Sequence, residues 1–236
     1  MYLSGCVTQT LLANPRPELG LMYQPGMGND SRAFQFWRFA CDNGRFAKPD
    51  EWNAGDWLEW LAGLRRYRSN CLFAVAPDVV GDAVATLNLS RPYLETIRHL
   101  GYRAAFVAQD GFHDAFPDPD SFDVLFVGGR DAWKFSEDGG YAAARWARTH
   151  GKPTHQGRVN SESRTLTMHA DGFDSVDGTY LKYGPDENWP KLNAWLDRMS
   201  AQPALLSARS RGLDQTASEV RPQARYLPMD DVLHGM

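Results

Sequence analysis

The feature that most constrains the fold is a repeated pattern of short apolar runs, each ending in polar residues, that begins at about residue 70. CLFAVAPD (71–78), RAAFVAQDG (103–111) and FDVLFVGG (122–129) predict buried strands that run into loops. KPTHQGRVNS (152–161) and GFDSVDGT (172–179) are weaker examples of the same pattern. Longer helical stretches separate these runs, and such alternation of strands and helices indicates a parallel sheet with helical crossovers.

The stretches between the apolar runs predict the helices. Residues 81–102 are typical of a helix whose early part is broken or kinked before Pro92. DGGYAAARWARTHG (138–151) predicts a second helix that Gly151 ends, and NWPKLNAWLDRMS (188–200) predicts the last amphipathic helix.

The segment upstream of residue 70 continues the pattern. FQFWRFACDNGRF (34–46) predicts a strand that runs into a loop. AGDWLEWLAGLRRYRSN (54–70) predicts a helix, and one face of it carries apolar side chains that we expect in the core: Trp57, Leu58, Trp60, Leu61 and Leu64.

The chain length selects among parallel-sheet folds. Seven or eight strand–helix units in 236 residues fit a compact (β/α)8 TIM barrel better than an open doubly wound sheet. No G-x-G-x-x-G or Walker loop follows any of the predicted strands, which removes the commonest reason for an open sheet. We therefore predict one barrel domain over residues 1–200. Residues 201–236 differ in composition and predict a helical or irregular extension that packs on the barrel or trails from it.

Composition excludes several classes of protein. The net charge of −4 does not indicate a nucleic-acid binder, so a nucleic-acid substrate would need a local basic patch. The three cysteines and six histidines show no CxxC, HxH or HExxH spacing, which argues against a disulfide framework, a structural zinc site and a metal-dependent hydrolase. No apolar run approaches the ~20 residues that span a bilayer, and no signal peptide is recognisable, so the sequence predicts a cytoplasmic protein without a membrane segment.

Polar residues gather where the predicted strands end, which in a TIM barrel is the rim that carries the active site. Each of these residues by itself is equally well explained as a turn former or a helix cap. The prediction of an active site rests on their repeated placement at the strand ends. The candidates are Asp42, Asn43, Gly44, Asp78, Gln109, Asp110, Gly128, Gly129, His155, Gly157, Arg158, Asn160, Asp174 and Asp177.

Separated carboxylates on such a rim suit chemistry at a sugar carbon. One carboxylate attacks an anomeric carbon and forms a glycosyl ester, while a second acid transfers the proton of the leaving or entering group. A third carboxylate accepts paired N–H donors from a guanine-like edge. The strand pattern alone leaves Asp174 and Asp177 equivalent as nucleophile candidates.

Five of these segments also resemble, in chain order, those of a known family. CDNGRF (41–46) resembles a D-S-G-G-F segment, FAVAPD (73–78) an apolar strand ending in a base-recognising Asp, and FVAQDG (106–111) a V-Q-G segment. FVGGRDAW (126–133) resembles a G-G-L segment and GFDSVDGT a G-x-D-x-F-D segment. Over roughly residues 20–200 the chain thus resembles the tRNA-guanine transglycosylase superfamily, and within it the short phage and bacterial DpdA-like members that insert 7-deazaguanines into DNA.

The resemblance implies a TIM barrel and a base-exchange reaction. It implies that Asp177 is the nucleophile that attacks C1′ of the target guanosine nucleotide, and that Asp42 is the general acid/base. Asp174 takes a supporting role, although a rival register that aligns F-D-S differently gives the nucleophile's role to Asp174.

The resemblance also implies how the substrate is bound. Asp78, Gln109 and the Gly129 backbone would hold the base by its hydrogen-bonding edge. The remaining substrate-binding residues that it implies are Asn43, Gly128 and Arg130 around the pocket, His155, Arg158 and Asn160 as a signature of DNA-type members, and Arg158 and Arg164 as phosphate contacts. Four aromatic residues near the rim are candidates to stack on a base, although positions in the core explain most of them better: Trp37, Phe46, Phe112 and Trp133.

Departures from the family pattern favour an enzyme that acts on DNA. The C-x-C-x-x-C…H zinc ligands of the tRNA enzymes are absent from the sequence, and Arg130 stands where the family has an apolar residue. The expected function is a pentosyltransferase of phage DNA hypermodification that exchanges guanine for a 7-deazaguanine such as 7-cyano-7-deazaguanine, with DNA and the free base as partners and with neither cofactor nor metal. The alternatives are an RNA-acting transglycosylase, a two-carboxylate N-glycosidase and a non-catalytic barrel.

Overall fold

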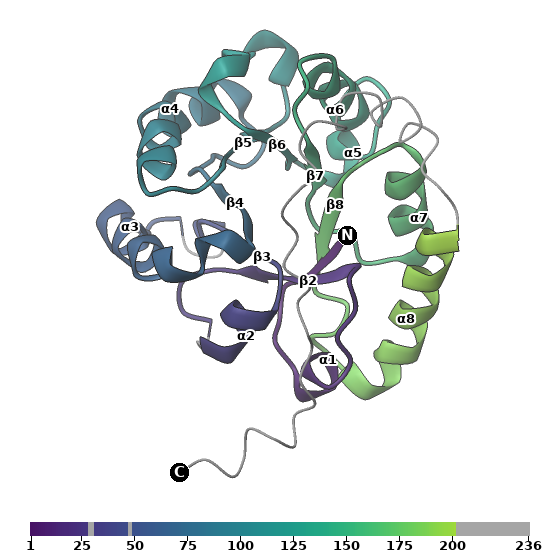
Figure 1. Cartoon of the computed structure of the whole chain (residues 1–236). Coiled ribbons are helices and arrows are strands. Elements are labelled where there is room, and N and C mark those ends of the chain that lie inside the picture. Colours follow the sequence, from purple (N-terminus) through teal and green to yellow (C-terminus); the bar gives the residue numbers. More distant parts are fainter. Residues whose placement is uncertain (28–30, 47–48, 202–236) are drawn as a thin grey trace, which may run out of the picture.

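Eight parallel strands close into a barrel in the computed structural model, which describes residues 1–27, 31–46 and 49–201. Helices surround the barrel (Figure 1). The strands are β1 (Tyr2–Ser4), β2 (Leu19–Tyr23), β3 (Phe39–Cys41), β4 (Cys71–Val75), β5 (Ala104–Ala108), β6 (Val124–Val127), β7 (Thr154–Gln156) and β8 (Ser175–Gly178). This architecture confirms the predicted (β/α)8 TIM barrel.

The barrel closes because β1 pairs in parallel with both β2 and β8. Tyr2 lies opposite Leu19 on one side, and Leu3 lies opposite Asp177 on the other. Neither β1 nor β2 was predicted as a strand from the sequence. Their pairing closes the barrel, so β8 has a neighbouring strand on both sides.

Two clusters of buried apolar side chains form the core. The smaller cluster consists of strand residues alone, including Leu3, Phe73 and Val107, and fills the interior of the barrel. The larger cluster joins strand residues such as Phe39 to helix residues such as Trp57, and lies between the barrel and its helices. Strands buried on both faces read as continuous apolar runs, which explains the pattern seen in the sequence.

The helices of the outer layer follow the strands around the barrel. They are α1 (Gln9–Leu12), α2 (Ser31–Phe36), α3 (Ala54–Gly63), α4 (Ala83–His99), α5 (Asp131–Lys134), α6 (Gly140–Thr149), α7 (Glu162–Ala170) and α8 (Pro185–Ala201), with 3-10 turns at Arg65–Asn70, Phe112–Asp114 and Pro119–Ser121. Side-chain oxygens of Asn53, Asp82 and Ser161 accept backbone N–H groups at the first turns of α3, α4 and α7, so helix caps fix where three of the crossovers begin.

Three predictions for the outer layer need adjustment. α4 runs unbroken through Pro92, which lies on its exposed face, so the carbonyl that the missing N–H leaves unpaired belongs to a solvent-exposed residue. The strand predicted from Phe34 begins at Phe39, because the first residues of that segment belong to α2. The helix predicted over residues 54–70 ends at Gly63 and continues as a 3-10 turn.

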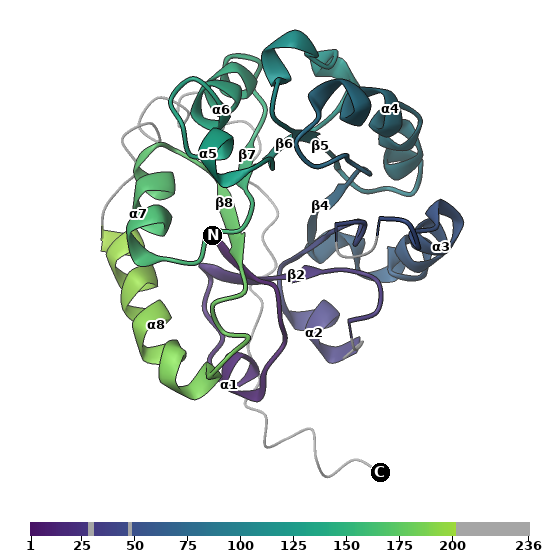
Figure 2. The same ribbon diagram turned by 180° about the vertical axis from the view of Figure 1, so that it is seen from behind.

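The last helix fastens the end of the barrel to its beginning. Both views show α8 beside α1 and α7 (Figures 1 and 2). The Arg16 guanidinium forms an ion pair with Asp197 at 2.7 Å and donates a hydrogen bond to Asn193 Oδ1 at 2.7 Å. The extension predicted over residues 201–236 lies outside the described residues apart from Ala201. None of the helices in the described ranges has the length and apolarity needed to cross a membrane.

Candidate active site

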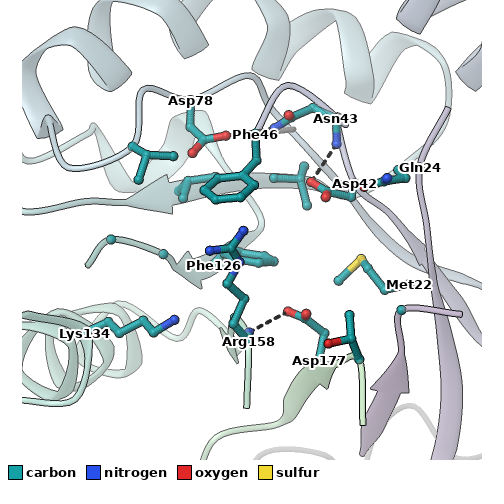
Figure 3. Close-up of a pocket in the computed structure, with 18 of the residues that line it drawn as sticks. Met22, Gln24, Asp42, Asn43, Phe46, Asp78, Phe126, Lys134, Arg158 and Asp177 are labelled. Atoms are coloured by element: carbon teal, nitrogen blue, oxygen red, sulfur yellow. Dashed lines mark hydrogen bonds between the residues drawn. The ribbon is translucent and has the colours of Figure 1, made fainter. Parts of the chain in front are cut away.

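A cavity of about 240 Å3 opens at the carboxyl ends of the barrel strands, and the end of every strand contributes to its wall. This is the position at which TIM barrels carry their active sites. The lining residues are Gly5, Met22, Gln24, Met27, Asp42, Asn43, Phe46, Val75, Asp78, Val80, Val107, Gln109, Phe126, Gly128, Gly129, Lys134, Gly157, Arg158, Asp177, Thr179 and Lys182. Figure 3 shows ten of them labelled, with three carboxylates directed into one space.

Asp177 is the penultimate residue of β8 and presents its carboxylate to the cavity with a side-chain exposure of 14%. Its Oδ1 accepts a hydrogen bond from His155 Nε2 at 3.0 Å and one from the Arg158 backbone N–H at 3.3 Å. Its Oδ2 has no hydrogen-bond partner among the described residues. The carboxylate is therefore oriented through one oxygen, and the other is free to react.

His155 lies on β7 and is fully buried inside the barrel. Burial lowers the pKa of this imidazole, and the neighbouring Asp177 opposes the shift without reversing it, so the ring is neutral. Its Nδ1 lies 2.8 Å from Ser175 Oγ. The arrangement that satisfies both contacts has Nε2–H donating to Asp177 and Nδ1 accepting from the serine hydroxyl.

Ser175 was not among the sequence candidates, although the two-residue period of a strand places it on the same side of β8 as Asp177. His155 was predicted as a substrate-binding residue. The structure instead places it beneath Asp177, where it orients the carboxylate and does not line the cavity.

Asp42 follows β3 and lies in the same cavity as Asp177 (Figure 3). Burial raises the pKa of Asp42 to about 7, the negative charges of Asp78 and Asp177 add to the rise, and the N–H groups of Asn43 and Gly44 oppose it. The Asn43 N–H donates to Asp42 Oδ1 at 2.8 Å. A carboxyl group that titrates near neutrality is suited both to give a proton and to take one.

Asp78 follows β4, and two amide side chains hold its carboxylate. Asn43 Nδ2 donates to Oδ1 at 3.0 Å, and Gln109 Nε2 donates to Oδ2 at 2.7 Å. Burial raises the pKa of Asp78, while Asn43, Arg45 and Gln109 counteract the rise. Asp78 lines the cavity, and a carboxylate oxygen that accepts one hydrogen bond can accept a second, so this group can receive N–H donors from a ligand.

Gln109 and Asn43 were predicted as substrate-binding residues, and the structure gives their side chains other partners. Gln109 Oε1 accepts the Gly81 N–H at 2.9 Å. Asn43 Nδ2 also donates to the Ala76 carbonyl at 3.0 Å, and its Oδ1 accepts the Arg45 N–H at 2.8 Å. Both amides line the cavity, but they act mainly as the support of Asp78.

Gly128 and Gly129 form a wall of the cavity at the end of β6 because no side chain fits there. A Cβ at Gly128 would lie 2.8 Å from Val107 Cγ1, and one at Gly129 would lie 2.7 Å from the Trp133 ring. Gly129 also has a φ of +83°, in the left-handed region that favours glycine. Packing against Val107, Gln109 and Trp133 therefore requires glycine at both positions.

Arg158 contacts Asp177 through its backbone and Phe46 through its side chain. Its φ of 59° turns its N–H toward Asp177, and its guanidinium lies 3.4 Å from the centre of the Phe46 ring. Phe46 is 54% exposed, so the stacked pair stands over the opening (Figure 3). Of the other aromatic residues predicted near the rim, Trp37 and Phe112 are buried and Trp133 packs against the core.

Besides His155, Gly44 and Asp110, four predicted site residues do not line the cavity. Asp174 precedes β8 at the amino end of the barrel and accepts the Thr154 N–H at 2.8 Å, so the structure separates it from Asp177 by the length of the strand. Arg130 is exposed and lies near Asp110, and Asn160 accepts the Thr179 N–H at 2.7 Å. Arg164 forms an ion pair with Asp131 at 3.2 Å.

Several cavity residues were not singled out from the sequence: Met22, Gln24, Met27, Val80, Phe126, Lys134, Thr179 and Lys182. Lys134 is the most unexpected of them, because a lysine in a polar stretch of sequence is normally expected to be solvent-exposed. No group of three or more metal-ligating side chains occurs within residues 1–27, 31–46 and 49–201.

No family model and no curated protein matches the chain. Among solved structures the chain is similar to the PaMucR phosphodiesterase in complex with c-di-GMP, with 17% sequence identity and a TM-score of 0.38. The similarity covers 61% of this chain and 66% of the phosphodiesterase chain, which is just under two thirds of the phosphodiesterase's length. It is also similar to tryptophan synthase from M. tuberculosis, at 12% identity over 78% of each chain, with a TM-score of 0.46. At these values neither neighbour's activity bears on the site.

Proposed function

We propose that this chain is a DNA guanine transglycosylase, which replaces guanine by a 7-deazaguanine base through a covalent aspartyl–glycosyl intermediate. The observation that carries the proposal is the pairing of Asp177 and Asp42 across one cavity. Asp177 Oδ2 is free to attack, and the pKa of Asp42 lies at about 7. The choice of guanine and of DNA rests on the resemblance of five strand-end segments to the DNA-acting branch of the tRNA-guanine transglycosylases.

In the first half of the reaction, Asp177 Oδ2 attacks C1′ of the target nucleotide and forms a glycosyl ester. The C1′–N9 bond breaks, its electron pair goes to the departing guanine, and protonated Asp42 supplies the proton that neutralises the base. His155 and the Arg158 N–H keep Oδ1 in place during the attack.

In the second half, the Asp42 carboxylate takes the N9 proton of the incoming base. The base nitrogen then attacks C1′, and the bond to Asp177 breaks, which restores both carboxyl groups to their starting states. A pKa near 7 serves both halves, since Asp42 must be an acid in one and a base in the other.

Asp78 has the geometry to recognise the base in both halves. Asp78 lines the cavity, and each of its oxygens accepts one scaffold hydrogen bond and can accept a second, which suits the N1–H and 2-amino donors of guanine and of 7-deazaguanines. The Gly128–Gly129 backbone lines the cavity and would lie against the opposite edge of the base, and Phe46 lines the cavity where it can stack on the ring.

The decisive experiment incubates the protein with radiolabelled 7-cyano-7-deazaguanine and either guanine-containing DNA or tRNA. The proposal expects label in DNA and a matching release of guanine. Label in tRNA alone would assign the chain to the RNA-acting enzymes, and release of guanine without incorporation would identify an N-glycosidase. Asp177→Asn is the inactive variant, and Asp174→Asn, which removes a carboxylate three positions away but outside the cavity, is its matched control.

A further inference from the structure

Lys134 is a buried cation whose position the proposed chemistry leaves unexplained. Its side chain is 2% exposed, yet it lines the cavity from α5, which begins directly after the Gly128–Gly129 wall. Figure 3 shows the side chain extending toward Arg158 and Asp177. An ammonium group is costly to bury, so a side chain that turns inward rather than toward water needs a compensating partner.

The partner that the structure provides is insufficient. Lys134 Nζ lies 3.1 Å from Asp131 Oδ1, but Asp131 is 64% exposed and also binds Arg164 through Oδ2 at 3.2 Å. An ammonium has three N–H donors, and Lys134 makes no other hydrogen bond to a described residue. Donors are therefore left for a ligand in the cavity.

Two further cations line the same cavity as Lys134. Arg158 follows β7 and Lys182 follows β8, both line the cavity, and neither forms an ion pair with a described residue. The loops after the seventh and eighth strands are those at which TIM barrels frequently bind phosphate. Among the three carboxylates that line the cavity, the one whose charge acts on Lys134 is Asp177.

We propose that Lys134, together with Arg158 and Lys182, binds a phosphodiester group next to the target nucleotide of the DNA strand. A phosphate there would accept the N–H donors of Lys134 that Asp131 leaves without a partner, and it would hold the sugar with C1′ toward Asp177 Oδ2. The site rests on the proposed function for the identity of the polymer, but its chemistry requires only a phosphodiester. Lys134 thereby takes the role that the sequence suggested for Arg164, whose guanidinium is engaged by Asp131 outside the cavity.

The test measures binding and does not require turnover. Single-stranded oligonucleotides with one guanine are prepared with normal linkages or with one neutral methylphosphonate next to that guanine. Their dissociation constants for Asp177→Asn protein are measured by fluorescence anisotropy over a range of salt concentrations. Neutralising one particular phosphate should weaken binding by about tenfold and lower the slope of log Kd against log salt by about 0.7, the value for one contact on a single strand.

The matching protein change is Lys134→Met, which keeps the aliphatic volume and removes the charge. It should weaken binding of the normal strand by about tenfold and leave binding of the strand with that phosphate neutralised unchanged. Lys191→Met, on the exposed face of α8, is the control and should change neither value. An equal loss of affinity for the normal and the neutralised oligonucleotide would show that Lys134 only supports the fold. Unchanged affinity for both oligonucleotides would show that Lys134 does not bind the phosphate.

The oligonucleotide scan keeps the proposal testable even if Lys134→Met does not fold, because it uses protein that retains the lysine. A scan in which no single phosphate matters would overturn the proposal. Phosphate-dependent binding without base exchange in the active enzyme would contradict the proposed function and leave the phosphate site standing.

Discussion

Two aspartates of the same strand segment show how position along a barrel strand decides what a carboxylate does. Asp174 precedes β8 at the amino end of the barrel, is exposed, and accepts the Thr154 N–H. Its own carbonyl accepts the N-terminal ammonium of Met1 at 2.9 Å, so it ties β7 and β1 to the start of β8. Asp177 is the penultimate residue of the strand and lines the cavity, held by a buried histidine.

A shift of three residues along this segment therefore changes what an aspartate contacts. In a parallel barrel the amino ends of the strands carry residues that fasten the fold, and the carboxyl ends carry the active site. Ser175 and Asp177 point to the same side of β8, which brings one against each ring nitrogen of His155. Asp174 lies before the paired residues of the strand and has no such partner.

The largest expected difference is between the variants in which Asp177 or Asp174 is replaced by asparagine. Asp177→Asn should reduce base exchange by about a thousandfold or more, because the nucleophile is lost. Asp174→Asn should leave the rate within about twofold of the parent. Steady-state incorporation of labelled base into DNA measures both. A large loss in Asp174→Asn with activity retained in Asp177→Asn would reverse the assignment.

The next effect concerns the proton donor across the cavity. Asp42→Asn should lower the rate by about 10^2 to 10^4-fold, the usual contribution of a general acid/base. In the parent protein, single-turnover loss of guanine should fall as the pH rises through about 7, since the step needs protonated Asp42. Rapid-quench measurements from pH 5 to pH 9 test this, and a flat profile through pH 7 would exclude Asp42 as the acid.

Asp42 should also make the fold less stable in its charged form. Its pKa rises from an ordinary 3.8 to about 7 on folding, so the folded protein binds the proton more tightly, and stability falls as the pH rises between those values. Asp42→Asn should therefore raise Tm at pH 8 by about a few degrees and have little effect at pH 4. Thermal melts at the two pH values would contradict this if the gain appeared only at pH 4.

A smaller effect is expected from the residues beneath Asp177. His155→Gln and Ser175→Ala should lower kcat by about tenfold with little change in KM, because they position the nucleophile and do not touch the base. Burial lowers the pKa of His155 below its ordinary 6.5, so the unfolded chain binds the proton more tightly and stability falls as the pH drops below about 6.5. His155→Gln should weaken that acid-side dependence, and an unaltered pH–stability curve would show that His155 is not its source.

The smallest effect lies at the other end of the strand. Asp174→Ala removes the acceptor of the Thr154 N–H and should cost about 1 kcal/mol of stability, or about 2–4 °C in Tm, without changing kcat or KM. Differential scanning calorimetry with parallel activity assays measures both. A change in kcat without a change in Tm would place Asp174 in the catalytic machinery after all.

Most of the fold was predictable because strands buried on both faces leave continuous apolar runs. β4, β5 and β6 stand out for this reason, and each ends in the polar residues that mark the rim. β1 has three residues, too few to show a period, and β2 lies in a stretch with no preceding helix pattern. The continuation of α4 through Pro92 could not be predicted, because the sequence alone does not show that Pro92 lies on the exposed face of the helix.

The site was predictable where position along a strand determines the outcome, as for Asp42, Asp78 and Asp177. It was less predictable where the outcome depends on hydrogen bonds between strands. Nothing in the spacing of Asn43 and Gln109 shows that both amides converge on Asp78. Lys134 was missed because the direction of a long flexible side chain follows from its surroundings, which here turn it into the cavity.

The most direct test of the account is to locate the covalent intermediate. The protein is incubated with guanine-containing DNA without an incoming base, denatured, and digested with nuclease and trypsin, and the peptide spanning residues 165–182 is sequenced by tandem mass spectrometry. The account predicts a nucleotide adduct whose fragments place it on Asp177. An adduct on Asp174, Asp42 or Asp78 would contradict it, and so would base exchange that proceeds at full rate with no adduct at all.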